Sequence, residues 1–388
     1  MIPPPHGGRL VDKVVTGPRR ERRAEEIREL PAITPFIDQI YDAEKIAQGA
    51  YSPLEGFMDS ATLAGVLEKG RLPDGLPWPM PIFLAPPDRA SREVLGAVKP
   101  GDDIALRDEG GRPFAILHLT EKFPLEKGKV AQGAYGTQDP RHPNVADLTE
   151  MGDTAVAGPV ELVHALDLPA HSFERTPREM REEFQRRGWK NVAGYQCRNP
   201  PHTAHEYLQR CTLEREDVDG LLIHPVVGRL KKGDYRPEVI LASYDTLVRN
   251  YYPPDRVLLA SLSITMRYAG PKAALFYAIV RKNYGCGLYI VGRDQAGVGK
   301  FYDPFACQRI FDEFDVGVIP LRYGETFYCR ICRGMATGKT CAHPPEAHLA
   351  TSQTGIRQRL LAGESLPTEI LRPEVAKILA RGDALLPS

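Results

Sequence analysis

The sequence has no excess of charge of either sign and no long apolar run. Its 388 residues contain 50 lysines and arginines against 50 aspartates and glutamates, so its formal net charge is zero. A balanced chain lacks the overall positive field that recruits nucleic acid or acidic membranes. No apolar run is long enough to cross a bilayer. We therefore expect neither nucleic acid nor a membrane as partner, and any affinity for anions must be local.

Cysteine is also scarce. Seven cysteines, an odd number with three of them clustered, argue against a disulfide framework. The N-terminus lacks the charged-then-apolar order of a secretory signal. Hydrophobic residues make up 42% of the chain, which is ample for packed cores, and the length is typical of two or three domains. These features predict a cytoplasmic protein.

The most informative segment runs from Gln196 to His205. It follows the apolar run Asn191–Tyr195, which we expect to be a strand, and it leads into a helical pattern. A strand-to-helix turn offers free backbone N–H groups and a positive dipole end, which suits an anion. This turn also carries polar and basic side chains, namely Gln196, Arg198, Asn199, His202 and His205. The pattern predicts a site for phosphate or sulfate.

Two other interpretations of this segment stay open on spacing alone. Asn-Pro and Pro-Pro are common in loops, and Asn199 could serve only as a helix cap. His202 and His205 are three apart and share one face of the first helical turn, so they could be half of a metal site. The zinc motif of metalloproteases, however, places its histidines four apart around a Glu, which is missing here.

From about residue 168 the pattern alternates between strands and helices. Strands are expected at 220–224, 256–260 and 287–291, and helices at 177–188, 238–250 and 271–284. Such alternation predicts a parallel, doubly wound sheet with ligands beyond the carboxyl ends of its strands. The loop Gly292–Gly297 directly follows the last of these strands, so the two loops can face one pocket.

Residues 75–165 show a different pattern of short apolar runs broken by turns. The runs are 80–84, 103–106 and 113–117, with a hairpin turn at 109–111 between the last two. They predict a mostly β domain. The charged run at 19–26 is expected to be a solvated helix face or arm.

These segments resemble the ATP sulfurylase (sulfate adenylyltransferase) family, in particular its zinc-bearing bacterial type without a fused kinase domain. The family segment Gln-x-Arg-Asn-Pro-x-His-x-x-His is present at 196–205, and Gly-Arg-Asp-x-Ala-Gly is present at 292–297. Further similar blocks stand at 51–58, 222–225, 266–271 and 281–286. The chain departs from the pattern at Gln295, where many members have His, and at Val298, where some have Pro. Both departures concern the finer contacts to nucleotide.

The resemblance implies an α/β architecture and a reaction. The fold would comprise a PUA-like N-terminal β domain (1–167), a Rossmann-like nucleotidyltransferase domain with a parallel sheet (168–325), and a small α-rich C-terminal domain with zinc (326–388). The reaction would convert MgATP and sulfate into adenosine 5′-phosphosulfate and pyrophosphate, or the reverse. Mg²⁺ would arrive with the nucleotide.

The resemblance also implies roles for individual residues. Gln196, Arg198 and the backbone at Ala296 would bind sulfate. Asn199 would donate to the α-phosphate, and His202 and His205 would stabilise the α–β bridge and the departing pyrophosphate. The other substrate-binding residues would be Gly292, Arg293 and Asp294, with Arg293 on the phosphate side.

The second chemical signal is the cysteine cluster Cys329, Cys332 and Cys341. A Cys-x-x-Cys pair directs two thiolates to one ion, and one further Cys and one His complete a tetrahedral zinc set. The alternative is a redox pair or free thiols. The fourth ligand could be His343 or His348. Because His348 precedes 352–357, which resembles the family's Ser-Gly-Thr-x-x-Arg, we prefer His348 as ligand of a structural zinc ion.

Two rival functions come from other classes. One is another nucleotidyltransferase of the same superfamily that loads a different acid or a phosphorylated alcohol. The other is a nonenzymatic RNA-binding protein, against which the neutral balance and the lack of a basic aromatic stripe count. For the assembly, a homodimer or higher homo-oligomer is the default expectation.

Overall fold

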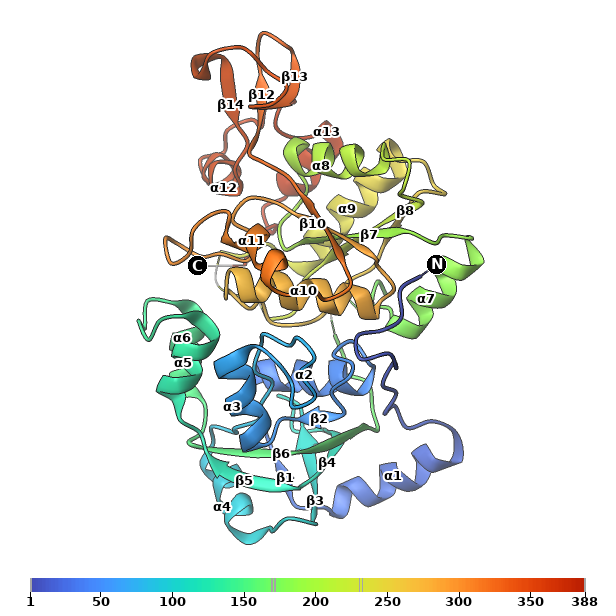
Figure 1. Ribbon diagram of the computed structural model, residues 1–388, viewed down its shortest axis with the longest axis vertical. Coiled ribbons are helices and arrows are strands. Elements are labelled where there is room, and N and C mark those ends of the chain that lie inside the picture. The colour runs from blue at the N-terminus through green and yellow to red at the C-terminus, as the bar shows by residue number, and fades with distance from the viewer. Residues whose placement is uncertain (1, 169, 171, 230, 232, 387–388) are drawn as a thin grey trace.

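The computed structural model describes residues 2–168, 170, 172–229, 231 and 233–386. Figure 1 shows three layers along the long axis: an N-terminal lobe, a central sheet flanked by helices, and a small hairpin that projects at the far end. Within the described ranges, none of the helices combines the length and the apolar character that a membrane span requires.

The N-terminal lobe is built on a six-stranded sheet of order β1-β3-β4-β6-β2, with β5 paired to β6. Its neighbours are antiparallel except for β1 and β3. The hairpin expected around 109–111 is confirmed, because β3 and β4 pair across it. The strands are β1 (Ala32–Ile33), β2 (Gly56–Phe57), β3 (Asp103–Arg107), β4 (Pro113–His118), β5 (Glu121–Pro124) and β6 (Thr154–Leu162).

The apolar run at 80–84 differs from the expectation. Only Leu84 makes an isolated bridge, to Val156, and the described residues of the run form no strand. Pro81 interrupts any ladder there because it lacks a backbone N–H. The run is apolar because it fills the core: Met80, Ile82 and Leu84 are fully buried.

The lobe also contains more helix than its short apolar runs suggested. α2 explains why pattern alone missed part of it: the helix is buried on nearly every side, and its buried residues include the charged Asp38, Asp42 and Lys45, so no clean apolar stripe marks it. The charged run at 19–26 lies on α1, where only Ile27 is buried, as expected. The helices are α1 (Gly17–Glu29), α2 (Ile37–Ala47), α3 (Ser60–Lys69), α4 (Arg89–Ala97), α5 (Lys127–Tyr135) and α6 (Pro143–Glu150).

The central sheet is parallel, as predicted, with order β11-β10-β7-β8-β9. Its strands are β7 (Val192–Cys197), β8 (Gly220–Pro225), β9 (Val257–Leu259), β10 (Leu288–Val291) and β11 (Ile319–Arg322). The strand order reverses between β7 and β10, which pair at Leu288 and Ala193. Ligands of doubly wound sheets bind at the carboxyl ends of such a reversal. The segments after β7 and β10 therefore start side by side.

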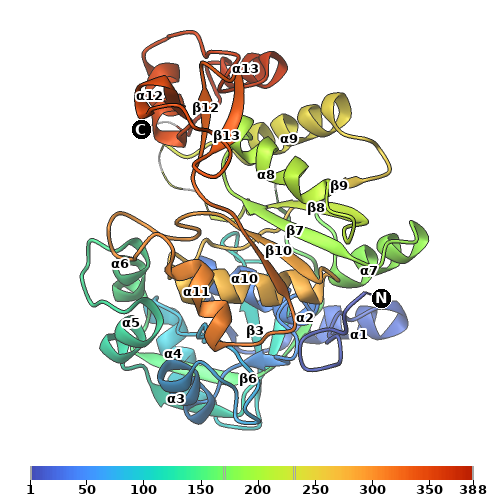
Figure 2. The same ribbon diagram turned by 45° about the horizontal axis from the view of Figure 1, so that its top comes forward.

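Helices cover both faces of this sheet (Figures 1 and 2). α7 and α10 pack with Val192, Leu222 and Tyr289 on one face, in a core that continues into the N-terminal lobe. α8, α9 and α13 (Pro373–Leu379) pack with the alternate residues, such as Ala193 and Ile223, on the other face. The flanking helices are α7 (Pro177–Arg186), α8 (Thr203–Leu213), α9 (Pro237–Tyr251), α10 (Pro271–Asn283) and α11 (Ala306–Glu313).

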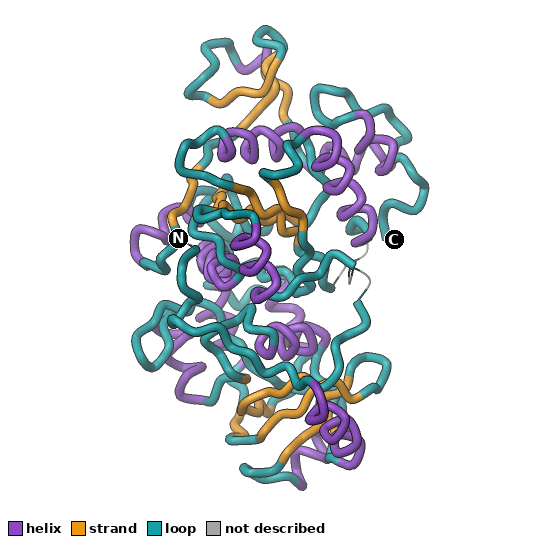
Figure 3. The backbone as a smooth tube through the Cα atoms, turned by 90° about the vertical axis from the view of Figure 1, so that its right-hand side faces the viewer, coloured by secondary structure: helices purple, strands orange, loops and turns teal. Residues whose placement is uncertain are grey.

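The chain after residue 325 first leaves this body and then returns to it (Figures 1 and 3). β12 (Thr326–Cys329), β13 (Gly334–Thr337) and β14 (His348–Ala350) form a three-stranded antiparallel sheet around β12. The 3-10 turn η1 (Pro345–Ala347) precedes β14. α12 (Gln353–Leu361) and α13 (Pro373–Leu379) then pack back, and Ile356, Val375 and Ile378 join the core beside α9.

Candidate active site

Two loops at the carboxyl ends of β7 and β10 share one cavity of about 360 Å³. The first leads from β7 into α8, and the second follows β10 directly. The residues predicted for substrate binding all line this cavity: Gln196, Arg198, Asn199, His202, His205, Gly292, Arg293, Asp294 and Ala296. Glu325, Thr326 and Thr351 line it from the C-terminal side. The tertiary structure thus brings the two predicted anion loops together.

His202 and His205 begin α8 as a stacked pair. Their ring centroids are 3.7 Å apart, and His202 is the residue that caps the helix. The His202 Nδ1 atom accepts a hydrogen bond from the backbone N–H of His205 at 3.4 Å. A neutral imidazole that accepts at Nδ1 carries its proton at Nε2, which leaves that N–H free to donate.

Both histidines are neutral at pH 7. Burial lowers the pKa of His202 well below its ordinary value, with His205 adding to the effect, and burial lowers the pKa of His205 to about 4. Within the described ranges, the one group of three or more His, Cys, Asp or Glu residues placed to share a metal ion lies in the cysteine cluster. Both imidazoles are therefore neutral, and the Nε2–H of His202 is free to donate.

Arg198 is held from the side by two groups that sequence reasoning missed. Its Nη2 lies 2.6 Å from Asp234 Oδ1, and its guanidinium stands over the Tyr268 ring at 5.3 Å from the centroid. Stacking and a carboxylate partner restrict the plane of the guanidinium, so its remaining donors point in a defined direction. Tyr268 lies in the block 266–271, whereas nothing in the sequence marked Asp234.

The two amide side chains of the first loop each have an engaged oxygen. Asn199 Oδ1 accepts from Arg357 Nη2 at 2.9 Å. Gln196 Oε1 accepts from the Tyr289 hydroxyl at 3.4 Å, and that hydroxyl in turn accepts from Gln295 Nε2 at 2.5 Å. Because each amide oxygen faces a donor, the NH₂ group of the same amide points away from that donor; the Gln196 Nε2 atom lies 3.8 Å from Met266 Sδ. Both amides are therefore set to donate, as an anion requires.

The second loop is tightly turned. Asp294 and Ala296 have φ values of 54° and 58°, in the left-handed region that residues other than glycine rarely adopt. The Asp294 N–H donates to the Pro304 carbonyl at 2.7 Å. A Cβ atom at Gly297 would lie 2.0 Å from Asp294 Oδ1, so any larger residue there would displace the Asp294 carboxylate. Arg293 is half exposed and lies 3.5 Å from Glu325.

The C-terminal segment holds the first loop from outside the cavity. The Gln353 Nε2 atom donates to the Pro200 carbonyl at 2.8 Å. The Thr203 N–H donates to the Ile370 carbonyl at 2.9 Å, and its hydroxyl donates to the Glu369 carbonyl at 2.8 Å. Together with Arg357, these contacts connect the chain that follows β14 to the start of α8.

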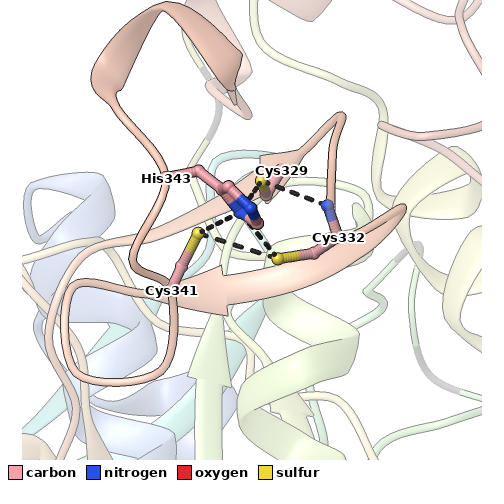
Figure 4. A group of neighbouring side chains, drawn as sticks. All are labelled: Cys329, Cys332, Cys341 and His343. Atoms are coloured by element: carbon pink, nitrogen blue, oxygen red, sulfur yellow. Dashed lines mark hydrogen bonds between the residues drawn. The ribbon is translucent and has the colours of Figure 1, made fainter.

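A second cluster lies in the projecting hairpin (Figure 4). The ligand atoms of Cys329, Cys332, Cys341 and His343 all lie within 4.8 Å of one another. The His343 Nδ1 atom is 3.4, 3.3 and 3.5 Å from the three sulfurs in that order. Ligands of one tetrahedral zinc ion, at about 2.3 Å for sulfur and 2.0–2.1 Å for nitrogen, stand roughly 3.5–3.8 Å apart. The cluster fits a metal ion such as zinc.

The preference for His348 as the fourth ligand is corrected by this geometry. His348 Nε2 comes within 3.8 Å of Cys341 Sγ alone, and its ring stacks on Phe327 with centroids 3.6 Å apart. The reason is the stacking: pairing with Cys329 of β12 places His348 on the same face of the sheet, but its ring lies against Phe327 and not among the sulfurs. His343 lies in a loop two residues after Cys341 and can turn its Nδ1 inward.

A parallel sheet with two anion loops at its point of strand reversal defines the class of Rossmann-like nucleotide-binding enzymes. Residues 171–382 match the ATP-sulfurylase family model, and residues 3–165 match that of the PUA-like domain. The chain belongs to the ATP-sulfurylase (sulfate adenylyltransferase) family and is an enzyme, a nucleotidyltransferase. The family prediction is confirmed, and no finding favours the RNA-binding alternative.

Individual relatives cover nearly the whole chain. The sulfate adenylyltransferase of Symbiobacterium thermophilum is 46% identical over 381 residues, 97% of this chain and 95% of the relative. The sulfate adenylyltransferase of Halothermothrix orenii is 41% identical over 383 residues, which cover 97% of this chain and 98% of the relative. A solved structure, the hexameric APS kinase from Thiobacillus denitrificans, is 30% identical with a TM-score of 0.77, covering 98% of this chain and 69% of that one.

Proposed function

We propose that this enzyme transfers the adenylyl group of MgATP to sulfate, producing adenosine 5′-phosphosulfate and pyrophosphate, and that it also runs the reverse reaction. The observation that carries the proposal is the single cavity lined by both loops, with amide, guanidinium and imidazole donors around it. ATP, sulfate, adenosine 5′-phosphosulfate and pyrophosphate are all anions. A site rich in oriented donors suits each of them.

The chemistry needs positioning and charge stabilisation. Sulfate is a weak nucleophile, and its oxygen would attack the α-phosphorus in line with the departing pyrophosphate. Holding two anions in that geometry makes the reaction effectively unimolecular, and donors aimed at developing charge lower the barrier further. No covalent intermediate with the protein is needed.

The sulfate would lie against the first residues of the Gln196–His205 loop. Arg198 would donate two parallel hydrogen bonds to two sulfate oxygens, and the Gln196 amide would donate a third. The backbone of the turned loop at Ala296 would complete the sulfate pocket. Asp234 and Tyr268, which fix the guanidinium, would set the sulfate's orientation through Arg198.

The nucleotide phosphates would occupy the rest of the cavity. The Asn199 amide would donate to the α-phosphate, and the stacked histidines would donate to the α–β bridge and to the departing pyrophosphate. Both imidazoles are neutral in the free enzyme. The negative charge that builds up on the leaving group would raise the pKa of each imidazole and so favour its protonation. Arg293 would bind the phosphates from the second loop, where Gly292 and Asp294 would contact the nucleotide.

We assign the hairpin cluster to a structural zinc ion held by Cys329, Cys332, Cys341 and His343. Zinc there would supply folding energy, because binding deprotonates the thiols and cross-links a small sheet that has little core of its own. Mg²⁺ would enter with ATP. A homodimer or larger homo-oligomer, a cytoplasmic location and the domain limits 1–167, 168–325 and 326–388 stay predictions.

The test is release of pyrophosphate from MgATP with and without sulfate. We expect release that depends on sulfate and stays low with other small acids, together with ATP formation from adenosine 5′-phosphosulfate and pyrophosphate. Arg249→Ala serves as the matched control, because Arg249 is an exposed arginine that pairs with Asp245 on α9, on a helix that does not line the cavity. Sulfate-independent release, or release driven by another acid, would point to the rival nucleotidyltransferase.

A further inference from the structure

One arginine outside the cavity contacts the proposed phosphate-binding amide directly. Arg357 of α12 donates from Nη2 to Asn199 Oδ1 at 2.9 Å, although the two residues are 158 positions apart. The Arg357 guanidinium also stands over the Tyr235 ring at 5.2 Å from the centroid, and both side chains of the hydrogen bond are half-buried. Arg357 is not among the residues that line the cavity.

The direction of this hydrogen bond is certain from chemistry. A guanidinium has five N–H donors and no acceptor, so it can bond only to the oxygen of the Asn199 amide. A terminal amide can otherwise turn over and exchange its oxygen and nitrogen. A turned Asn199 would present its oxygen to the phosphates and repel them. Arg357 disfavours the turned orientation, because turning would place the NH₂ group of Asn199 against the N–H group of Arg357.

We propose that Arg357 is a positioning residue for adenylyl transfer: it locks the Asn199 amide with its N–H groups toward the α-phosphate. The inference rests on the proposed function, in which Asn199 contacts that phosphate. A hydrogen bond from a charged donor also polarises the amide, which strengthens the hydrogen bonds that its N–H groups donate. Arg357 thereby contributes to stabilising the transition state without touching the nucleotide.

The surroundings of Arg357 hold it in register with the loop. Ser352 caps α12 by accepting from the Gly355 N–H at 3.1 Å, and Gln353, one residue later, bonds to the Pro200 carbonyl. The helix therefore begins at a defined place relative to the residue after Asn199. Arg357 lies one helical turn after Gln353 on the same face of α12. Gln353 contacts Pro200 of the loop, and Arg357 contacts the preceding residue, Asn199.

A double-mutant cycle tests the proposal, with Arg357→Met, Asn199→Ala and the double variant assayed for sulfate-dependent pyrophosphate release. We expect Asn199→Ala to lower kcat on the order of a hundredfold, as the loss of one transition-state donor does. We expect Arg357→Met to lower kcat roughly tenfold in the wild type through misplacement of that donor, and less than twofold in the Asn199→Ala background.

The matched control is Arg359→Met, which removes an arginine from the same helix that pairs with Glu364 at 3.4 Å. It should leave kcat within twofold. Arg357→Lys, which keeps one charged donor, should recover part of the activity. Asn199→Asp should keep the contact to Arg357 and a normal melting temperature, yet lose activity, because an oxygen replaces the N–H group.

The outcomes separate the proposals. Equal losses from Arg357→Met in both backgrounds would show that Arg357 does not act through Asn199 and would overturn the inference, as would unchanged kcat. If Arg357→Met does not fold, Arg357→Lys and Asn199→Asp test the inference instead. A fully active Asn199→Asp enzyme would refute the proposal that Asn199 donates to the phosphate. An inactive wild type would refute the proposed function itself.

Discussion

Replacing Arg198 should impair sulfate binding more than the loss of one hydrogen-bond donor would, because Arg198 also neutralises its partner Asp234. The two side chains are 2.6 Å apart, and only 13% of the Asp234 side chain is exposed. The backbone N–H of Lys231 also donates to Asp234 Oδ2 at 3.0 Å, which helps to hold the carboxylate in place. Arg198→Ala therefore removes a donor and also leaves an uncompensated negative charge beside a site for anions.

The magnitude follows from two terms. Loss of one donor to an oxyanion costs about 3–4 kcal/mol, or a factor of roughly 10² to 10³. An anion on the far side of the guanidinium would lie roughly 6 Å from the carboxylate, where two like charges repel by about 3 kcal/mol at an effective dielectric constant of 20. Screening by solvent in the open cavity lowers this second term to roughly 1.5–2.5 kcal/mol.

The assay is sulfate-dependent pyrophosphate release at saturating MgATP, with sulfate varied. We expect Arg198→Ala to lower kcat/KM for sulfate by at least about a thousandfold. Adding Asp234→Asn to that variant should recover about tenfold to a hundredfold. Arg198→Lys should retain charge compensation yet remain impaired, since an ammonium cannot donate two parallel hydrogen bonds to sulfate.

Two results would refute this reasoning. Unchanged sulfate kinetics in Arg198→Ala would remove Arg198 from the sulfate site. A double variant no better than Arg198→Ala would show that the Asp234 charge does not act on the bound anion. Arg249→Ala with Asp245→Asn is the matched control, because it changes an exposed arginine–aspartate pair 2.9 Å apart on α9.

Three further predictions concern the metal cluster and pH. Cys332→Ser should lower the zinc content from one ion per chain and lower the melting temperature, measured by metal analysis and calorimetry; a stable, metal-free wild type would contradict the site. His343→Ala should reduce zinc content far more than His348→Ala, and the reverse order would restore His348 as ligand. Because burial lowers the pKa of His205 to about 4, the unfolded chain binds a proton near pH 6.5 that the folded protein does not. The free energy of unfolding should therefore be level above pH 6.5 and fall from pH 6.5 toward 4. Because burial also lowers the pKa of His6, His202 and His224, His205→Asn should reduce this slope in urea titrations without abolishing it, and an unchanged slope would contradict a lowered pKa at His205.

The features that the sequence determined by itself are local ones. Apolar strands alternating with helices predict a parallel sheet because each period reflects backbone geometry within a few residues. The loops at 196–205 and 292–297 follow such strands directly, so the sheet must place them at one edge. The Cys329 and Cys332 pair is likewise a matter of spacing along a single turn.

The tertiary structure alone decided the contacts that orient these groups. Arg357 reaches Asn199, and Asp234 reaches Arg198, because the chain after the hairpin and the segment before α9 fold back against the first loop. The periodicity of apolar residues along the sequence carries no information about which distant segments fold back against this loop. The choice of His343 over His348 has the same origin. Stacking on Phe327 of β12 holds the His348 ring, whereas the loop after Cys341 turns the His343 ring toward the sulfurs.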